Sequence, residues 1–257
     1  PRDPGEIVRA VVRVTQPGPA RGLPALVLEP EEPAVDRWRP TELDELADRL
    51  RAAAAAQRTR PLVVAVDGRS ASGKTTLADR LSSHLPDTTV VRTDDLAWHE
   101  PLFDWAHLLR DEVLRPAVQG AAVSFTPPAW AARGRPGAID VPADTKILLV
   151  EGVGAADAAV ADLVDLIVWV QADRDMARSR GLERDLASGA NGDRAQTLTF
   201  WSAWYDAERA HLAADRPWER ADVVVLGTPP PDSPEDVLHV ADTLPLTSAS
   251  PNEIRHD

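Results

Sequence analysis

The chain contains no cysteine among its 257 residues, which excludes disulfide bonds, thiolate metal sites and a cysteine nucleophile. Positive charge is also scarce: 28 Lys and Arg stand against 41 Asp and Glu, for a net charge of −13. This balance argues against nucleic-acid binding, which needs a basic surface. No apolar run approaches the roughly 18 residues of a membrane span, and the first residues lack a signal-peptide core. We therefore expect a cytoplasmic protein with neither a membrane nor a nucleic-acid partner.

One segment carries a complete phosphate-binding pattern. The apolar run Leu62–Val66 predicts a buried strand, and Gly68–Thr75 follows it with the sequence Gly-Arg-Ser-Ala-Ser-Gly-Lys-Thr, a full match to G-x-x-x-x-G-K-[ST]. Leu77, Leu81 and Leu85 then begin a helical pattern. Backbone N–H groups of such a turn converge on phosphate oxygens at the positive end of the helix. The segment predicts binding of a nucleoside triphosphate.

The residue types of this loop predict its cofactors. Lys74 places a positive charge on the β- and γ-phosphates, and the Thr75 hydroxyl is a hard oxygen ligand suited to Mg²⁺. We expect ATP and Mg²⁺, although the loop is equally compatible with GTP. The predicted nucleotide-binding residues in the loop and the first turn of its helix are Gly68, Ser70, Ala71, Ser72, Gly73, Lys74, Thr75 and Thr76.

Apolar segments alternate with helical ones along the chain, which is typical of a parallel, doubly wound sheet. We predict an α/β fold of the P-loop NTPase class, with five parallel strands flanked by helices. The expected strands are Leu62–Val66, Thr88–Arg92, Lys146–Val150, Leu163–Val170 and Ala221–Leu226. One expected helix runs from Thr41, as N-cap, to Gln57, and another has the pattern Leu77, Leu81 and Leu85. Further helices are expected over residues 105–118, 173–188, 196–214 and 233–244.

The ends of the chain differ from this pattern. Residues 1–40 are rich in proline and contain two β-like stretches, Glu6–Thr15 and Leu23–Leu28, which predict an N-terminal extension in the form of a β-hairpin. Residues 41–244 then form the P-loop domain, with a long connection rich in Pro and Gly at 120–144. Residues 245–257 are a polar tail.

Three acidic sites follow predicted strands, at the edge where open parallel sheets bind ligands. Asp94 and Asp95 follow the second strand, where an Asx turn or a helix cap is the alternative interpretation. Glu151 ends the third strand and resembles a Walker B acid, the carboxylate that a P-loop enzyme needs near Mg²⁺. Asp67, just before Gly68, either stabilises the turn or acts as a ligand.

An arginine-rich segment at 173–185 has two interpretations. It fits a solvated helix with ion pairs between successive turns. It also fits a lid over residues 173–190 whose arginines neutralise the transferred phosphoryl group. Because it follows a P-loop, we favour the lid, with Arg178 and Arg180 as catalytic residues and Arg184 as a nucleotide-binding residue.

Tryptophan is the common aromatic residue, with eight copies against three Phe and one Tyr. Trp98 and Trp105 flank a loop shortly after Asp94, where a ring either stacks on a flat substrate or anchors the loop. The helix expected at 196–214 has a stripe that predicts packing on the core, formed by Leu198, Trp201, Tyr205 and Leu212.

Together these pieces resemble the uridine kinase and nicotinamide riboside kinase group of P-loop small-molecule kinases, over roughly residues 60–230. The resemblance rests on four motifs in order: Gly68–Thr75, Thr93–Trp98, Phe103–Trp105 and Val150–Gly152. It implies that Asp94 is the base toward the substrate hydroxyl, that Asp104 holds ribose hydroxyls and that Glu151 serves the metal. The lid arginines and the last core strand are also in place.

Some features depart from the family pattern. The aromatic pair usual after the two acids is Leu96–Ala97 here, with Trp98 one step later, and neither residues 1–60 nor 120–144 align with the family's motifs. The expected acceptor-binding residues are Asp94, Trp98, Asp104 and Trp105, with Asp94, Lys74, Arg178 and Arg180 as the catalytic set and Thr75 and Glu151 as metal ligands.

The combined hypothesis is an ATP–Mg²⁺-dependent kinase that phosphorylates a hydroxyl of a small molecule, with the 5′-hydroxyl of a nucleoside or related riboside as the first choice. A kinase of a non-nucleoside acceptor, such as a vitamin precursor, a sugar or a secondary metabolite, is the alternative. A P-loop ATPase or nucleotide-sensing regulator is the third hypothesis. Both a monomer and a homo-oligomer are open.

Overall fold

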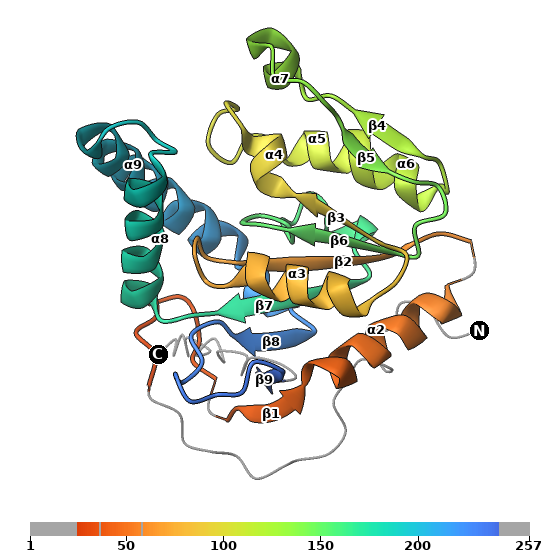
Figure 1. Cartoon of the computed structure of the whole chain (residues 1–257), viewed down its shortest axis with the longest axis horizontal. Coiled ribbons are helices and arrows are strands. Elements are labelled where there is room, and N and C mark those ends of the chain that lie inside the picture. Colours follow the sequence, from red (N-terminus) through yellow and green to blue (C-terminus); the bar gives the residue numbers. More distant parts are fainter. Residues whose placement is uncertain (1–24, 36, 58, 242–257) are drawn as a thin grey trace, which may run out of the picture.

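The computed structural model describes residues 25–35, 37–57 and 59–241 (Figure 1). The strand expected at 6–15 and the polar tail at 245–257 lie outside these residues. The strand expected at Leu23–Leu28 lies partly outside them, and its described part, residues 25–28, is not a strand. No described helix is long and apolar enough to cross a membrane.

A seven-stranded sheet forms the centre of the molecule, in the order β1-β9-β8-β7-β2-β6-β3. The predicted set of parallel strands is confirmed: β3, β6, β2, β7 and β8 pair in parallel. Their bounds are β2 (Leu62–Gly68), β3 (Thr88–Arg92), β6 (Ile147–Glu151), β7 (Leu166–Gln171) and β8 (Val223–Leu226). The α/β fold with helices on both faces of a mostly parallel sheet therefore holds.

Two antiparallel strands that the sequence analysis did not predict extend the β8 edge, β9 (Val237–Ala241) and β1 (Arg39–Glu42). The helix predicted at 233–244 is therefore wrong, because a short apolar segment fits both periods and pairing with β8 decides between them. Thr41 is not an N-cap. It is a buried residue of β1 opposite Leu238, and α2 (Leu43–Ala56) begins two residues later with Glu42 as its N-cap.

Helices cover both faces of the sheet. On one face α2 and α3 (Lys74–His84) bury Leu50, Leu77 and Leu81 against Val64 of β2. On the other face lies the helical segment predicted at 105–118, which is built from α5 (Ala106–Leu108), a π-helical turn (Leu109–Leu114) and α6 (Arg115–Val118). Short 3₁₀ turns at Ala161–Leu163 and Pro217–Arg220 complete this side.

Two groups of elements lie on either side of the edge at which the parallel strands end (Figure 1). One is the pair α8 (Arg174–Ser188) and α9 (Arg194–Asp215), close to the helices predicted there. The other contains α4 (Thr93–Ala97) and the connection at 120–144, which forms the antiparallel pair β4 (Val123–Phe125) and β5 (Ile139–Val141) with α7 (Pro128–Arg133) between them. The edge of the sheet between these groups is where a ligand is expected.

Candidate active site

The predicted phosphate loop connects β2 to α3. Gly68 ends β2 with a φ of +154°, and a Cβ at this position would lie 2.6 Å from the carbonyl oxygen of Val170 and 2.9 Å from Ser72 Oγ. Gly73, with a φ of +106°, is the N-cap of α3. Both positions therefore require glycine. The loop packs closely on β7, and its own residue Ser72 is buried.

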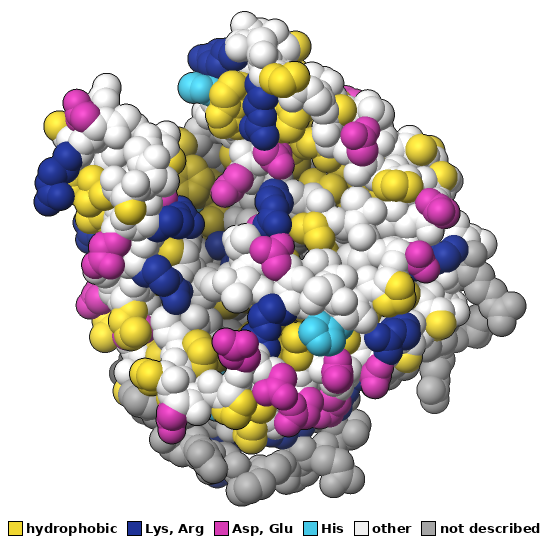
Figure 2. Space-filling view, viewed as in Figure 1, with side chains coloured by type: hydrophobic (Ala, Val, Ile, Leu, Met, Phe, Trp, Pro, Cys, Tyr) yellow, Lys and Arg dark blue, Asp and Glu magenta, His cyan; other side chains and the backbone are white. Residues whose placement is uncertain are grey.

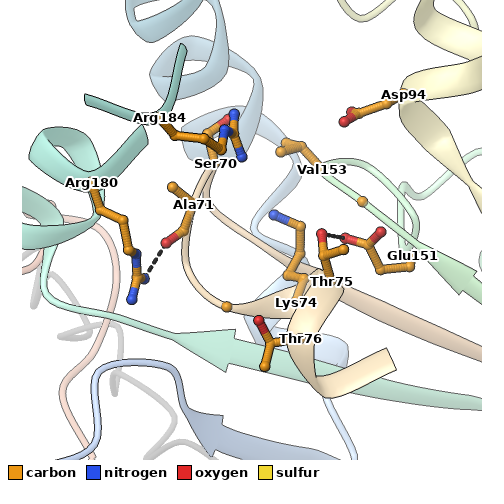
Figure 3. A pocket seen from close by; sticks show the side chains of 12 residues that line it. Ser70, Ala71, Lys74, Thr75, Thr76, Asp94, Glu151, Val153, Arg180 and Arg184 are labelled. Carbon is orange, nitrogen blue, oxygen red and sulfur yellow. Dashed lines mark hydrogen bonds between the residues drawn. The ribbon is translucent and has the colours of Figure 1, made fainter. Parts of the chain in front are cut away.

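The loop borders a cavity of about 330 Å³, here called the phosphate cavity (Figure 3). Buried Lys74 points into this space, and its Nζ donates to the carbonyl oxygen of Arg69 at 2.7 Å. Most of the predicted nucleotide-binding residues line it: Ser70, Ala71, Gly73, Lys74, Thr75, Thr76 and Arg184. Gly68 and Ser72 shape the loop and do not line the cavity. A concave surface of loop backbone and a lysine suits a phosphate group.

The two predicted metal ligands lie side by side (Figure 3). Thr75 Oγ1 donates to Glu151 Oε1 at 3.0 Å, and Arg92 binds the other oxygen, Nη1 to Glu151 Oε2 at 3.1 Å. Among the described residues, no three His, Cys, Asp or Glu side chains form a metal cluster of their own. A hydroxyl and a carboxylate beside a phosphate cavity fit Mg²⁺, which commonly takes few protein oxygens and completes its shell with phosphate and water.

Asp67 stabilises the turn, one of the two roles considered for it. The side chain is fully buried, and its carboxylate accepts hydrogen bonds from the backbone N–H groups of Gly68 at 2.7 Å, Ala156 at 2.9 Å and Gly154 at 3.1 Å. Burial raises the pKa of Asp67 from 3.8 to about 6, against the lowering effect of these hydrogen bonds. The carboxylate thus joins the phosphate loop to the segment after β6.

Helix α8 brings two of the three predicted lid arginines to the phosphate cavity. Arg180 and Arg184 line it, and Arg180 Nη2 donates to the carbonyl oxygen of Ala71 (Figure 3). Partial burial lowers the pKa of Arg180, and the neighbouring positive charge of Arg184 lowers it further. Arg178 does not line this cavity, since its guanidinium lies 4.5 Å from the ring centroid of Tyr205. Two adjacent positive charges at a phosphate cavity favour an anionic ligand.

A second cavity of about 820 Å³, here called the acceptor cavity, adjoins the phosphate cavity. Figure 2 shows the molecule hollowed between α8–α9 and the α4–α7 side. Ser70, Asp94 and Arg184 line both cavities. Asp94 is exposed and has no hydrogen bond or ion pair with any described residue, whereas Asp95 accepts from Arg135 Nη2 at 2.5 Å. The two neighbouring acids therefore have different surroundings.

The predicted acceptor residues are divided by the structure. Trp98 lines the acceptor cavity, but Asp104 and Trp105 line neither of these two cavities. Phe103 has a φ of +61°, and this turn leaves Asp104 exposed while Trp105 is buried in the core. Trp105 therefore anchors the loop, the second of its two proposed roles.

Sequence reasoning missed the contribution of α9. Phe200, Trp201 and Trp204 line the acceptor cavity. Trp201 and Leu212 are buried as the predicted stripe requires, but Leu198 is 43% exposed and that part of the prediction is wrong. The spacing of Phe200 and Trp204, four residues apart on one helical face, was the available signal.

A segment before β1 also reaches the phosphate loop. Glu32 is buried and accepts from Arg69 Nε at 3.1 Å and from Trp169 Nε1 at 2.9 Å. Buried Glu29 accepts from the Tyr205 hydroxyl of α9 at 2.6 Å. Burial, together with this carboxylate, raises the pKa of Tyr205. The segment thus connects the phosphate loop with α9, which composition alone did not reveal.

Comparison with known families gives a match for the middle of the chain: residues 121–197 match the Phosphoribulokinase / Uridine kinase family. The chain resembles the kinases of this family. The match confirms the resemblance predicted from the motifs, and with it the prediction of a kinase. It includes most of the connection at 120–144, which the motifs had left unaligned, and it ends at the start of α9.

No curated protein matches the chain. Solved structures that resemble it include a "putative fructose transport system kinase" from Silicibacter sp. TM1040, with 17% identity, a TM-score of 0.46 and coverage of 66% of this chain and 95% of that one. Another is a "possible uridine kinase" from Bacillus stearothermophilus, with 20% identity, a TM-score of 0.41 and coverage of 70% and 98%. Likeness at this level says nothing about the acceptor of this chain.

Proposed function

We propose that the protein transfers the γ-phosphoryl group of ATP to a hydroxyl of a small molecule bound in the acceptor cavity. The observation that carries this proposal is the position of Asp94, a carboxylate that lines both cavities and has no partner among the described residues. A group that orients a nucleophile toward a phosphoryl group must reach both ligands at once. Asp94 meets that requirement, and Asp95, paired with Arg135, does not.

The nucleotide phosphates bind to the loop backbone and to Lys74. Arg180 and Arg184 face the same cavity from α8 and stabilise negative charge on the transferred group. The guanidinium of Arg180 exchanges its contact with the carbonyl oxygen of Ala71 for phosphate oxygens. Positive charge then surrounds the phosphates from the loop on one side and from the lid on the other.

Thr75 and Glu151 are the residues that would hold Mg²⁺. When bound, Mg²⁺ neutralises charge on the β- and γ-phosphate oxygens. Arg92 fixes the orientation of the Glu151 carboxylate by binding Oε2, so that Oε1 faces Thr75.

Asp94 accepts the proton of the acceptor hydroxyl while the hydroxyl oxygen forms a bond to the γ-phosphorus. The bond from that phosphorus to the bridging oxygen breaks, and this oxygen leaves with ADP. Positioning supplies most of the rate in such a transfer, because the phosphoryl group needs little covalent assistance. The products are ADP and a phosphate ester.

Asp94→Asn, with Asp95→Asn as the matched control, tests this proposal. Asp94→Asn should lower turnover by about 10²-fold or more and leave ATP binding nearly unchanged, and Asp95→Asn should do much less. ADP formation is measured with and without a panel of alcohols, ribosides included. Greater damage from Asp95→Asn would overturn the role of Asp94, and ATP hydrolysis that no alcohol stimulates would favour the ATPase hypothesis.

The proposed acceptor is a nucleoside or related riboside that reacts at its 5′-hydroxyl. A non-nucleoside alcohol is the second candidate, and one observation favours it: Asp104, the residue expected to hold the ribose diol, does not line the acceptor cavity. Comparing ribosides with 2′-deoxyribosides separates the two. Loss of far more than tenfold in kcat/KM for the deoxy compounds supports a diol site, and equal use of both favours the second candidate.

A further inference from the structure

Helix α9 presents an aromatic surface to the acceptor cavity. The rings of Phe200 and Trp204 are stacked, with centroids 6.0 Å apart and an interplanar angle of 21°, and both residues line the cavity. Phe200 remains 39% exposed, so part of its ring surface is free. Trp98 lines the same cavity from the end of α4. The cavity therefore offers aromatic faces to a ligand from two elements.

The carboxylate of Asp185, in the last turn of α8, already has hydrogen-bond partners within the protein. Asp185 accepts from Trp201 Nε1 at 2.9 Å, from Asn191 Nδ2 at 3.0 Å and from Arg184 Nε at 2.8 Å. This carboxylate lines the cavity but has little capacity left for a hydroxyl-rich ligand. The residues of α9 itself that line the cavity are Phe200, Trp201 and Trp204, so this helix contributes rings to recognition.

The aromatic surface is also fixed to the phosphate loop. Trp204 Nε1 donates to Ser70 Oγ at 2.7 Å, and one turn later Glu208 Oε1 accepts from the backbone N–H of Ser70 at 2.7 Å. Ser70 lines both cavities. Trp204 also contacts Phe103, with ring centroids 5.2 Å apart, so a ligand ring packs on the exposed part of Phe200, which is itself stacked on Trp204. That ring is held at a set position relative to the phosphates, which leaves Asp94 for the reacting hydroxyl.

We infer that Phe200 and Trp204 are the recognition surface for a flat ring in the acceptor. The acceptor is then a ring-bearing alcohol, meaning an alcohol that carries a flat, unsaturated ring, rather than a free sugar or an open-chain polyol. The inference rests on the proposed function, since it names the acceptor of that reaction. The volume of about 820 Å³ lies in the upper part of the usual range for small-molecule pockets, about 300–1,000 Å³, and leaves room for a ring beside the alcohol.

The test uses variants that separate the ring from its hydrogen bond. Phe200→Leu keeps an apolar side chain and loses the aromatic face, so KM for a ring-bearing alcohol should rise roughly 2- to 10-fold. Trp204→Phe keeps a ring and loses the N–H, so KM for ATP should rise while KM for the alcohol changes less. Leu198→Ala, exposed on α9 and outside the cavity, is the control without effect.

Probes are uridine and pyridoxine, which carry a flat ring, and D-ribose and D-fructose, which do not. Calorimetric binding with a non-hydrolysable ATP analogue is measured beside phosphoryl transfer. Binding of at least one ring-bearing probe that weakens in Phe200→Leu supports the inference. Equal or better binding of the sugars, no binding of either ring-bearing probe, or no effect of Phe200→Leu overturns it. Ring binding that depends on Phe200 without transfer to any probe supports the aromatic surface and overturns the proposed function instead.

Discussion

The phosphate cavity and the acceptor cavity share three residues but are built in different ways. The first is formed by a loop whose buried groups, Asp67 and Lys74 among them, have partners inside the protein. The second lies between α4 and the α8–α9 pair, with exposed side chains such as Phe200 and Asp94. Under the proposed function, the part of the reaction common to such kinases uses buried groups with protein partners, and the part that varies uses exposed side chains.

The largest expected effect is that of Lys74→Ala. The ammonium group stabilises charge that is present only when phosphate is bound, so phosphoryl transfer should fall by about 10³-fold while the fold persists. Turnover with ATP measures this change. Binding of a ring-bearing probe in the absence of nucleotide is the control, because the acceptor cavity does not contain Lys74. An unchanged turnover number contradicts the assignment of the phosphate loop.

Glu32→Gln should destabilise the support of the loop. The change leaves Arg69 buried without its anionic partner, which lowers the free energy of unfolding by about 3–5 kcal/mol. Urea denaturation measures the loss, and Glu31→Gln, an exposed neighbour, is the matched control. Equal stability of the two variants would show that residues before β1 do not hold the loop.

Asp67→Asn should change how stability depends on pH. Ionisation of Asp67 is harder in the folded chain than in the unfolded one, because its pKa is raised from 3.8 to about 6. Its contribution to the free energy of unfolding therefore falls as pH rises through this window, by about 3 kcal/mol, and is constant above it. Denaturation at about pH 4 and about pH 7 should show the wild type losing about 2 kcal/mol more stability than the variant, because part of the change lies below pH 4. A parallel pH dependence contradicts the buried titration.

The smallest effect is expected at Gly181 of α8, which lies between a residue of the acceptor cavity, Trp201, and a residue of the phosphate cavity, Ala71. A Cβ at Gly181 of α8 would overlap the Trp201 ring and lie 3.0 Å from the Cβ of Ala71. Gly181→Ala should therefore destabilise by about 1–3 kcal/mol, less the gain of up to about 1 kcal/mol from helix propensity. Thermal unfolding measures it, with Ser179→Ala on the same helix as the control. A more stable Gly181→Ala variant would mean that the two helices separate easily.

The sequence predicted those parts of the site that depend on local backbone chemistry. The conformation of Gly68–Thr75 depends on glycines within the segment itself. Thr75 and Glu151 lie close together because β2 and β6 are adjacent parallel strands. The same reasoning placed Asp94 at the end of β3. The five parallel strands followed from apolar segments bounded by helical patterns.

The remaining parts depend on contacts between distant segments. Glu32 and Glu208 act on the phosphate loop from far along the chain, and no local pattern marks a carboxylate that will be buried. The turn at Phe103, whose ring stacks on His211 of α9 with centroids 4.4 Å apart, separates Asp104 from the site. In β9 a short apolar segment became a strand because β8 offered an edge to pair with.

The pairing of β1 with β9 also bears on how the chain folds during synthesis. These strands come from opposite ends of the described chain, with Arg39 opposite Val240, and β9 covers the edge of β8, whose sequence is Val-Val-Val-Leu. Until β9 leaves the ribosome, this apolar edge has no partner on that side, and an open edge of this composition is a template for association between chains. Closing this edge of the sheet therefore follows synthesis of all the other described strands, and aggregation is favoured in the interval before it.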